Sequence, residues 1–186
     1  MILDDATGSM MEPSSTDPAR FAEMALPHLD AAYNLARWLT RDTNDASDVV
    51  QEAMLRALRF FGSYRGGSSK SWLLTIVRNT AVDWMRTNRP AQIAVQSGDD
   101  NPFENIADSG EDPEAALIRM GDRQQLDRLI AALPADFREC LVLRELEELS
   151  YKEIAAVTGV PIGTVMSRLA RARQLMQRAL TRENVT

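Results

Sequence analysis

The spacing of apolar residues is the feature that most constrains how this chain folds. In residues 19–90 and 123–186, apolar side chains recur every three or four positions, and the alternation typical of strands is nearly absent. Residues 91–122 interrupt this pattern with 8 acidic residues, 1 basic residue and few large apolar ones. Because such a segment cannot bury enough apolar surface to fold alone, the sequence predicts an all-α protein in which two small helical domains are joined by a flexible acidic linker.

The formal net charge of −6 is distributed unevenly along the chain. Residues 19–90 hold 10 basic and 7 acidic residues, and residues 123–186 hold 10 basic and 8 acidic residues. Both predicted domains are therefore mildly basic, and a basic face rather than the total charge decides whether a protein binds phosphate. Residues 1–18 hold 4 acidic residues and no basic ones, so we expect a disordered acidic extension there.

The residue counts argue against catalysis. One cysteine, Cys140, and one histidine, His28, form neither a disulfide framework nor a Cys/His zinc cluster. No glycine-rich run matches a phosphate-binding fingerprint. We therefore expect no enzymatic activity, no cofactor and no metal site. No apolar run approaches the roughly 20 residues that span a bilayer, so we expect a cytoplasmic protein without membrane insertion.

The first predicted domain contains three helical segments. The first begins near Phe21 and is kinked or restarted at Pro27. We expect Asp45 to cap a second helix that runs to about residue 61. A loop over residues 63–71 leads to a third helix over residues 72–87.

The third helix carries a polar face beside a basic loop. The spacing of Trp72, Asn79, Asp83 and Arg86 places them on one side of the helix. The loop before it supplies Tyr64, Arg65 and Lys70. Rings for stacking, cations for phosphate and an amide for base edges are what a single nucleic-acid strand requires. The alternative is that the tryptophans belong to the core and Asn79 bonds only to the backbone.

The second predicted domain contains a helix-turn-helix. A short helix over residues 126–133 ends at Pro134, and the next helix is expected to bury four apolar residues, Phe137, Cys140, Leu141 and Leu146. Ser150 and Glu153 form a capping box that opens a short helix ending at Gly159. After a compact turn, we expect Thr164 to cap a longer helix that buries Val165, Leu169, Ala172 and Met176.

The outer face of that last helix is basic. It presents Ser167, Arg168, Arg171, Gln174 and Arg178, and in a helix-turn-helix such residues contact base edges in the major groove. The alternative is a helical hairpin whose arginines are merely solvated.

The order of these parts resembles the extracytoplasmic-function group of the bacterial sigma-70 family. DASDVVQEA at residues 45–53 is similar to its polymerase-binding region 2.2, and WLLTIVRNTAVD at residues 72–83 is similar to its promoter-melting helix. LP at residues 133–134, SYKEIA at residues 150–155 and GTVMSRL at residues 163–169 resemble region 4. The resemblance covers roughly residues 20–90 and 123–180.

The resemblance implies a sigma factor that gives core RNA polymerase its promoter specificity. It implies contacts to the β′ clamp helices from Asp48, Gln51 and Glu52. It implies contacts to the single-stranded −10 element from Tyr64, Arg65, Lys70, Trp72, Asn79 and Arg86. It implies contacts to the −35 duplex from Thr164, Met166, Ser167, Arg168 and Arg171.

The resemblance also implies partners and domain roles. Residues 19–90 become region 2, residues 123–186 become region 4, and the linker over residues 91–122 would enter the active-centre cleft of the polymerase. The implied partners are core RNA polymerase, through its β′ clamp helices and β flap, promoter DNA and an anti-sigma factor. A stand-alone helix-turn-helix regulator is the alternative, and it leaves the first domain without a role.

Overall fold

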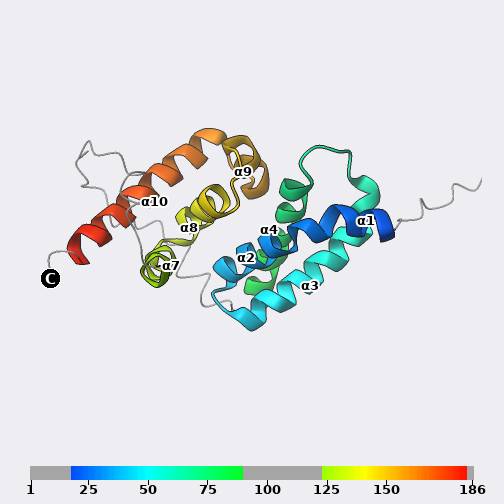
Figure 1. Ribbon diagram of the computed structural model, residues 1–186, viewed down its shortest axis with the longest axis horizontal. Coiled ribbons are helices and arrows are strands. Elements are labelled where there is room, and N and C mark those ends of the chain that lie inside the picture. The colour runs from blue at the N-terminus through cyan, green and yellow to red at the C-terminus, as the bar shows by residue number, and fades with distance from the viewer. Residues whose placement is uncertain (1–17, 90–122, 184–186) are drawn as a thin grey trace, which may run out of the picture.

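The computed structural model describes residues 18–89 and 123–183, and these form two helical blocks that lie side by side (Figure 1). The first block consists of α1 (Pro18–Ala25), η1 (Leu26–His28), α2 (Leu29–Thr40), α3 (Thr43–Phe60), η2 (Phe61–Ser63) and α4 (Ser69–Asn88). The second consists of α7 (Arg123–Ala132), α8 (Ala135–Leu141), the π-helical turn η3 (Val142–Leu146), α9 (Tyr151–Thr158) and α10 (Ile162–Glu183). No strand occurs in these two ranges, which confirms the predicted all-α fold. The predicted linker and most of the N-terminal extension lie outside the described residues.

Caps fix where the helices of the first block begin. Asp42, not Asp45, caps α3: its Oδ1 accepts hydrogen bonds from the backbone N–H groups of Asn44 at 2.8 Å and Asp45 at 3.0 Å. These hydrogen bonds lower the pKa of the Asp42 carboxyl. The prediction for Asp45 was wrong because the helix begins one turn earlier. The expected break at Pro27 is confirmed, since the 3-10 turn η1 separates α1 from α2.

The third helix also begins earlier than the apolar pattern predicted. Ser68 Oγ accepts from the backbone N–H of Ser71 at 3.2 Å, so α4 starts at Ser69 rather than Trp72. The preceding Gly66 and Gly67 have φ of 91° and 93°, a conformation that favours glycine. The loop is therefore shorter than expected and ends in a capped turn.

The second block confirms the capping box. Ser150 Oγ accepts from Glu153 N–H at 3.3 Å, and Glu153 Oε2 accepts from Ser150 N–H at 2.9 Å. Gly159, with φ of 73°, ends α9 as expected. Thr164 does not cap the last helix: α10 begins at Ile162, and the Thr164 N–H donates to the carbonyl of Pro161 at 2.9 Å.

The π-helical turn changes which residues of the second block are buried. Its wider turn is closed by the Glu147 N–H, which donates to the Val142 carbonyl at 3.1 Å. As a result Leu146, expected in the core, is 39% exposed, whereas Glu147 is only 5% exposed. Phe137 is half-buried, and the other expected core positions, Cys140 and Leu141, are buried.

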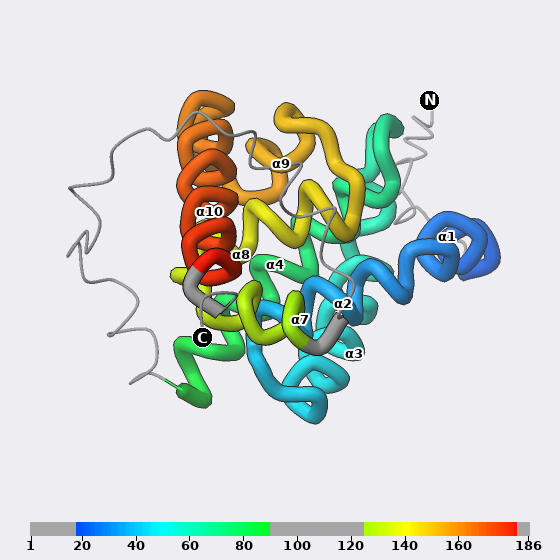
Figure 2. The backbone as a smooth tube through the Cα atoms, turned by 60° about the vertical axis from the view of Figure 1, so that its left-hand side comes forward, coloured from blue at the N-terminus to red at the C-terminus, as the bar shows by residue number. Residues whose placement is uncertain are grey.

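The two blocks share one hydrophobic core. Helix α4 packs against α9, and α2 packs against α8 and η3, as the two views in Figures 1 and 2 show. The buried faces of α4 (Leu73, Leu74 and Val77) and α10 (Val165 and Leu169) belong to this connected cluster. The described parts of the chain are thus in a closed arrangement.

Candidate nucleic-acid interface

An aromatic cluster supports the loop that precedes α4. The ring of Tyr64 lies 5.3 Å from that of Trp72 and 6.4 Å from that of Phe61, with which it stacks. Phe21 of α1 meets the edge of Phe61 at 5.5 Å. The Tyr64 hydroxyl donates to the Gly67 carbonyl at 2.7 Å and closes the loop. Tyr64 and Trp72 are both half-buried, so they build the base of the loop and expose only part of their rings.

The two cations of this loop differ in their surroundings. Arg65 is exposed, and its Nη1 donates to the Gly62 carbonyl at 3.0 Å. Lys70 is half-buried and points toward the second block, where its Nζ lies 3.0 Å from Glu147 Oε2. His28 Nε2 lies 2.9 Å from Ser69 Oγ, and partial burial and the nearby Lys70 charge lower the pKa of the His28 imidazole. Arg65 is therefore available for phosphate, whereas Lys70 is occupied.

The polar face predicted on α4 is present and faces solvent. Asn79, Asp83 and Arg86 are exposed, and the side chains of Asn79 and Arg86 make no hydrogen bond or ion pair to another described residue. Asp83 accepts from Arg56 Nη1 at 3.0 Å. An amide and a guanidinium two turns apart can therefore meet a base edge and a phosphate without first breaking a protein contact.

A second polar surface lies on α3. Asp48 and Gln51 are exposed, while Glu52 accepts from Arg56 Nε at 2.9 Å. Leu55, two turns after Asp48 on the same side, is 52% exposed. The sequence analysis missed Leu55, although a leucine in register with Asp48 and Gln51 could have indicated it.

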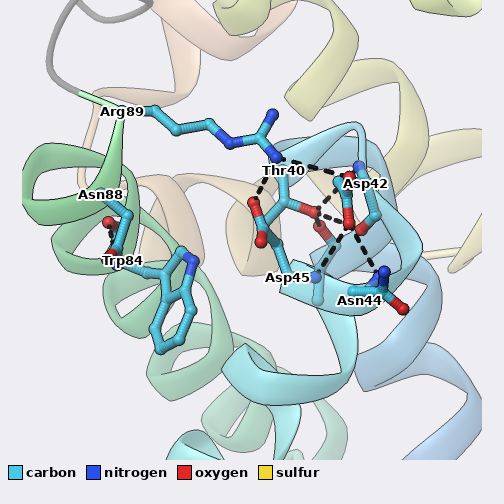
Figure 3. A network of polar contacts seen from close by, with 8 residues as sticks. Thr40, Asp42, Asn44, Asp45, Trp84, Asn88 and Arg89 are labelled. Atoms are coloured by element: carbon cyan, nitrogen blue, oxygen red, sulfur yellow. Dashed lines mark hydrogen bonds and ion pairs between the residues drawn. The ribbon is translucent and has the colours of Figure 1, made fainter.

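A clamp joins the first turn of α3 to the end of α4 (Figure 3). Arg89 Nη2 lies 2.8 Å from Asp45 Oδ2 and 3.4 Å from Asp42 Oδ2, next to the Thr40 hydroxyl and the Asp42 cap. This contact fixes the last turn of α4, which carries Arg86, relative to the helix that carries Asp48. It explains why Asp45 faces Arg89 rather than acting as a cap.

The basic face predicted on α10 is exposed only in part. Met166 is 53% exposed, and Ser167 and Arg171 are also exposed. Thr164 is half-buried, and its carbonyl accepts from the Ser167 hydroxyl at 3.0 Å. Arg168 does not extend freely: its Nη2 lies 2.5 Å from Asp136 Oδ2 of α8, and its side chain is 19% exposed.

The outer half of that face also differs from the expected row of arginines. Gln174 and Arg178 are half-buried, whereas Arg171 is exposed and its side chain contacts no other described residue through a hydrogen bond or ion pair. Arg173 Nη2 lies 2.7 Å from Glu145 Oε1, so this arginine stabilises the block itself. Among the arginines of α10 whose side chains are described, Arg171 is thus the exposed one.

A buried arginine that the sequence analysis did not single out stabilises the second block. Arg138 is 2% exposed, and its Nη1 donates to the carbonyls of Ala131 and Leu133, each at 3.0 Å. Burial and the Arg41 charge lower its pKa to about 10. Arg138 therefore satisfies the carbonyls at the end of α7 and has no exposed role.

The described residues contain no group of three or more His, Cys, Asp or Glu side chains that could hold a metal ion. Among the helices described, none is long and apolar enough to cross a membrane.

Two family models match the chain, one in each block. The model of sigma-70 region 2 matches residues 24–90, and the model of sigma-70 region 4 matches residues 123–176. The first range contains the α3 and α4 surfaces, and the second contains the helix-turn-helix.

Curated relatives carry the same assignment. The chain is 37% identical over 169 residues to the RNA polymerase sigma-H factor of Pseudomonas aeruginosa, with 88% of each chain covered. It is 40% identical over 137 residues to the ECF RNA polymerase sigma-E factor of Escherichia coli, covering 71% of this chain and 72% of the relative.

Solved structures have the same fold. The sigma factor RpoE of Bartonella quintana, in complex with the anti-sigma factor NepR, is 31% identical with a TM-score of 0.66, and the match covers 87% of this chain and 97% of that one. CnrH in complex with the cytosolic domain of CnrY, at 22% identity and a TM-score of 0.62, shares the fold, over 90% of this chain and 91% of that one. The two blocks, their order and these relatives agree, and the chain belongs to the extracytoplasmic-function group of the sigma-70 family of bacterial RNA polymerase sigma factors.

Proposed function

We propose that this protein binds core RNA polymerase and directs promoter-specific initiation by reading a −10 element with residues 19–90 and a −35 element with residues 123–186. The observation that carries the proposal is the pairing of two different exposed surfaces in one chain. One has an amide and a guanidinium on α4 beside a loop, and the other is the outer face of a helix-turn-helix. Such a chain acts as a transcription initiation factor and not as an enzyme.

The −10 element is proposed to bind as a separated strand. Asn79 would bond a base edge, Arg65 and Arg86 would contact phosphates, and the exposed parts of Tyr64 and Trp72 would stack on bases. Extruding a base costs a few kcal/mol of unstacking, which stacking and hydrogen bonds in a shaped site offset. Lys70 joins this set only when it leaves Glu147.

The −35 element is proposed to bind as duplex. The N-terminal turns of α10 would enter the major groove, with Arg171 on a guanine edge and Ser167 and Thr164 near the backbone. Met166 would give apolar contact to a base methyl group. Arg168 would act from the side, because its ion pair with Asp136 holds it against α8.

Polymerase docking is assigned to the α3 surface. Asp48, Gln51 and Glu52 would meet the β′ clamp helices, with Leu55 as an apolar contact beside them. The second block would contact the β flap, and the linker would enter the active-centre cleft. The proposal places the protein in the cytoplasm. Since RpoE of Bartonella quintana binds the anti-sigma factor NepR, an anti-sigma factor is proposed as a further partner.

Promoter-dependent transcription with core polymerase tests this function. Asp48→Arg should weaken association with core polymerase at least tenfold in an anisotropy titration, because it reverses a charge in the docking surface. Glu23→Arg, at an acidic position on α1 that is also exposed, serves as the matched control and should leave the affinity unchanged. Equal affinities of both variants for core polymerase would show that the docking surface does not include Asp48. Promoter binding without any association with core polymerase would favour the stand-alone regulator.

A further inference from the structure

The last residue of α3 carries an exposed aromatic ring. Phe60 is 59% exposed, the highest fraction among the large apolar residues of the two described ranges. Its neighbour Phe61 turns inward and joins the aromatic cluster beneath the loop. The backbone is held here, because the Phe60 carbonyl accepts from the Ser63 hydroxyl at 2.6 Å. A single exposed apolar side chain is ordinary on a protein surface, so the surroundings of Phe60 decide what it can do.

The packing of α3 against α4 places Phe60 on the same side as Asn79. The two helices run antiparallel, since the clamp in Figure 3 joins the first turn of α3 to the end of α4. Farther along, Arg56 of α3 donates to Asp83 of α4 at 3.0 Å, so these residues mark facing positions. One helical turn from each of them toward the connecting loop leads to Phe60 on α3 and Asn79 on α4. Both are exposed, so the ring and the amide share one solvent-facing side of the helix pair.

This side is distinct from the proposed docking surface on α3. Phe60 follows Leu55 by five residues, so the two side chains project about 140° apart around the helix. The docking surface carries the acidic residues Asp48 and Glu52, whereas residues 53–82 hold 5 basic residues and no acidic one. The exposed ring therefore belongs to the basic side of the first block, which suits a polyanion.

Two arginines near Phe60 in the chain are not paired with carboxylates. Arg59 is exposed and makes no hydrogen bond or ion pair to another described residue. Arg65 is also exposed, and its Nη1 donates to the Gly62 carbonyl at 3.0 Å, which holds the guanidinium at the turn after Phe60. A flat ring beside cations and an amide is the composition of a site for single-stranded nucleic acid.

We propose that the Phe60 ring is a stacking site for an unpaired base of the promoter strand that Asn79 contacts, with Arg59 and Arg65 on the adjacent phosphates. This inference rests on the proposed function, and it adds the end of α3 to a surface assigned above to α4 and its loop. Stacking uses the π-face that every base has, so Phe60 supplies affinity for an open strand without preference for one base. In duplex DNA neighbouring base pairs cover that face, so the contact forms only after the strands separate.

The test uses holoenzyme assembled from core polymerase and the full chain. The probe is a promoter fragment that the native holoenzyme transcribes, either mismatched across the −10 region or as intact duplex kept closed at low temperature. Phe60→Ala should lower the affinity for the mismatched fragment at least about fivefold, because one base–aromatic stack is lost. Its affinity for the closed duplex should stay within about twofold of the native value, since no unpaired base is available there.

Further substitutions separate a stacking ring from a general apolar contact. Phe60→Tyr keeps an aromatic ring and should bind the mismatched fragment within about twofold of the native protein. Phe60→Leu keeps apolar surface without a π-face, so it should lose nearly as much affinity as Phe60→Ala. Tyr33→Ala removes a ring of α2 that is 37% exposed, and as the matched control it should leave the affinity unchanged.

The salt dependence of binding separates the ring from the cations. Arg59→Gln should reduce the slope of log affinity against log salt concentration by about 1, because one phosphate contact is lost. Phe60→Ala should leave that slope unchanged, since stacking releases no counterion. Equal changes of slope for the two variants would overturn the assigned roles.

Replacement of Phe60 by the photoreactive amino acid benzoylphenylalanine identifies the partner directly. We expect crosslinks to the unpaired DNA of the mismatched fragment. Crosslinks confined to a polymerase subunit, or weaker association of Phe60→Ala with core polymerase, would overturn the stacking site in favour of a protein contact. Native affinity of Phe60→Ala for the mismatched fragment would overturn the stacking site alone. Absence of promoter-dependent transcription by the native protein would instead overturn the proposed function.

Discussion

The two DNA-facing surfaces of this protein are built in different ways. In the second block, the helix-turn-helix is defined by neighbours in sequence: the Ser150–Glu153 capping box, the left-handed Gly159 and the turn at Pro161. In the first block, the loop before α4 rests on an aromatic cluster drawn from α1, η2 and α4, and one of its cations is bound by the other block. The proposed duplex-binding surface is therefore complete within its own block, whereas Lys70 of the proposed single-strand surface is paired with Glu147 of the other block.

This contrast fits the two targets. Duplex DNA presents a groove of fixed shape, and a capped, short-range unit holds a helix rigidly enough to enter it. A single strand is flexible and must be held by rings and cations that converge from several places. A surface assembled from distant residues also depends on how the blocks are arranged, and in this arrangement Lys70 is bound to Glu147.

The largest expected effect comes from removing the base of the single-strand surface. Phe61→Ala deletes the ring that contacts Phe21, Tyr64 and Trp72, and it should lower the free energy of unfolding by about 2–3 kcal/mol in urea denaturation. Binding to a −10 single strand should fall with it, while binding to the −35 duplex persists.

The adjacent Phe60 is the matched control for this variant. It is 59% exposed, so Phe60→Ala should change stability by less than about 0.5 kcal/mol. Equal destabilisation by both variants would show that the cluster does not support the loop.

The next effect concerns the duplex reader. Arg171→Ala should cost about 1–3 kcal/mol of −35 binding if the guanidinium makes a bidentate base contact. The loss should be the same on intact promoter DNA and on DNA mismatched across the −10 region, because the −35 element is duplex in both. Gel-shift titrations on the two templates measure it, and a loss that disappears on the mismatched template would contradict the assignment.

Asn79→Ala should have a smaller effect, and unlike the Arg171→Ala effect it should depend on whether the DNA strands are separated. Loss of one base-edge hydrogen bond costs about 1 kcal/mol, and it should appear only after strand separation. Permanganate reactivity of the opened region should fall on intact DNA and recover in part on the mismatched template. Equal defects for Asn79→Ala and Arg171→Ala on both templates would contradict the assignment of single-strand binding to α4 and duplex binding to α10.

The smallest expected effect is the loss of stability when a helix cap is removed, and it should differ between the two surfaces. Ser150→Ala should lower stability by about 1 kcal/mol, and Ser68→Ala by less, because only Ser150 takes part in a reciprocal capping box. Thermal melts of the two variants measure the difference. A larger loss of stability for Ser68→Ala would contradict the view that the stronger cap lies in the second block.

The Ser150 cap also carries a pH dependence. The backbone N–H and the hydroxyl of Ser150 both lower the pKa of the Glu153 carboxyl below the ordinary value of 4.5, and Ser150→Ala removes the contribution of the hydroxyl. This stabilisation is complete above the unfolded pKa and is lost as the pH falls through the folded one. The difference in melting temperature between the native protein and Ser150→Ala should therefore shrink below about pH 4.5. A difference that is constant down to pH 3 would exclude the Glu153 contribution.

Some features of the site could be read from sequence because they depend on near neighbours. The polar face of α4 follows from helical spacing, and the exposure of Asn79, Asp83 and Arg86 agrees with that prediction. The capping box and Gly159 depend on contacts within one turn. The helices α3, α4 and α10 each start three residues earlier than predicted, because Asp42, Ser68 and Pro161 provide the first hydrogen-bond acceptors and apolar periodicity does not reveal them.

The sequence by itself determined the helical class, the two blocks and the residue types of both DNA-facing surfaces, since periodicity and capping act over a few positions. Tertiary structure decided which of those residues are free to act. Arg78 meets Glu139 across 61 residues, Lys70 meets Glu147 across 77, and Asn34 meets Glu147 across 113. The wide turn at Val142–Leu146 turns Glu147 inward and Leu146 outward, against the α-helical pattern. Such pairings depend on how the two blocks pack against each other. That packing is set by a shared core, and the residues on its two sides come from separate stretches of the sequence.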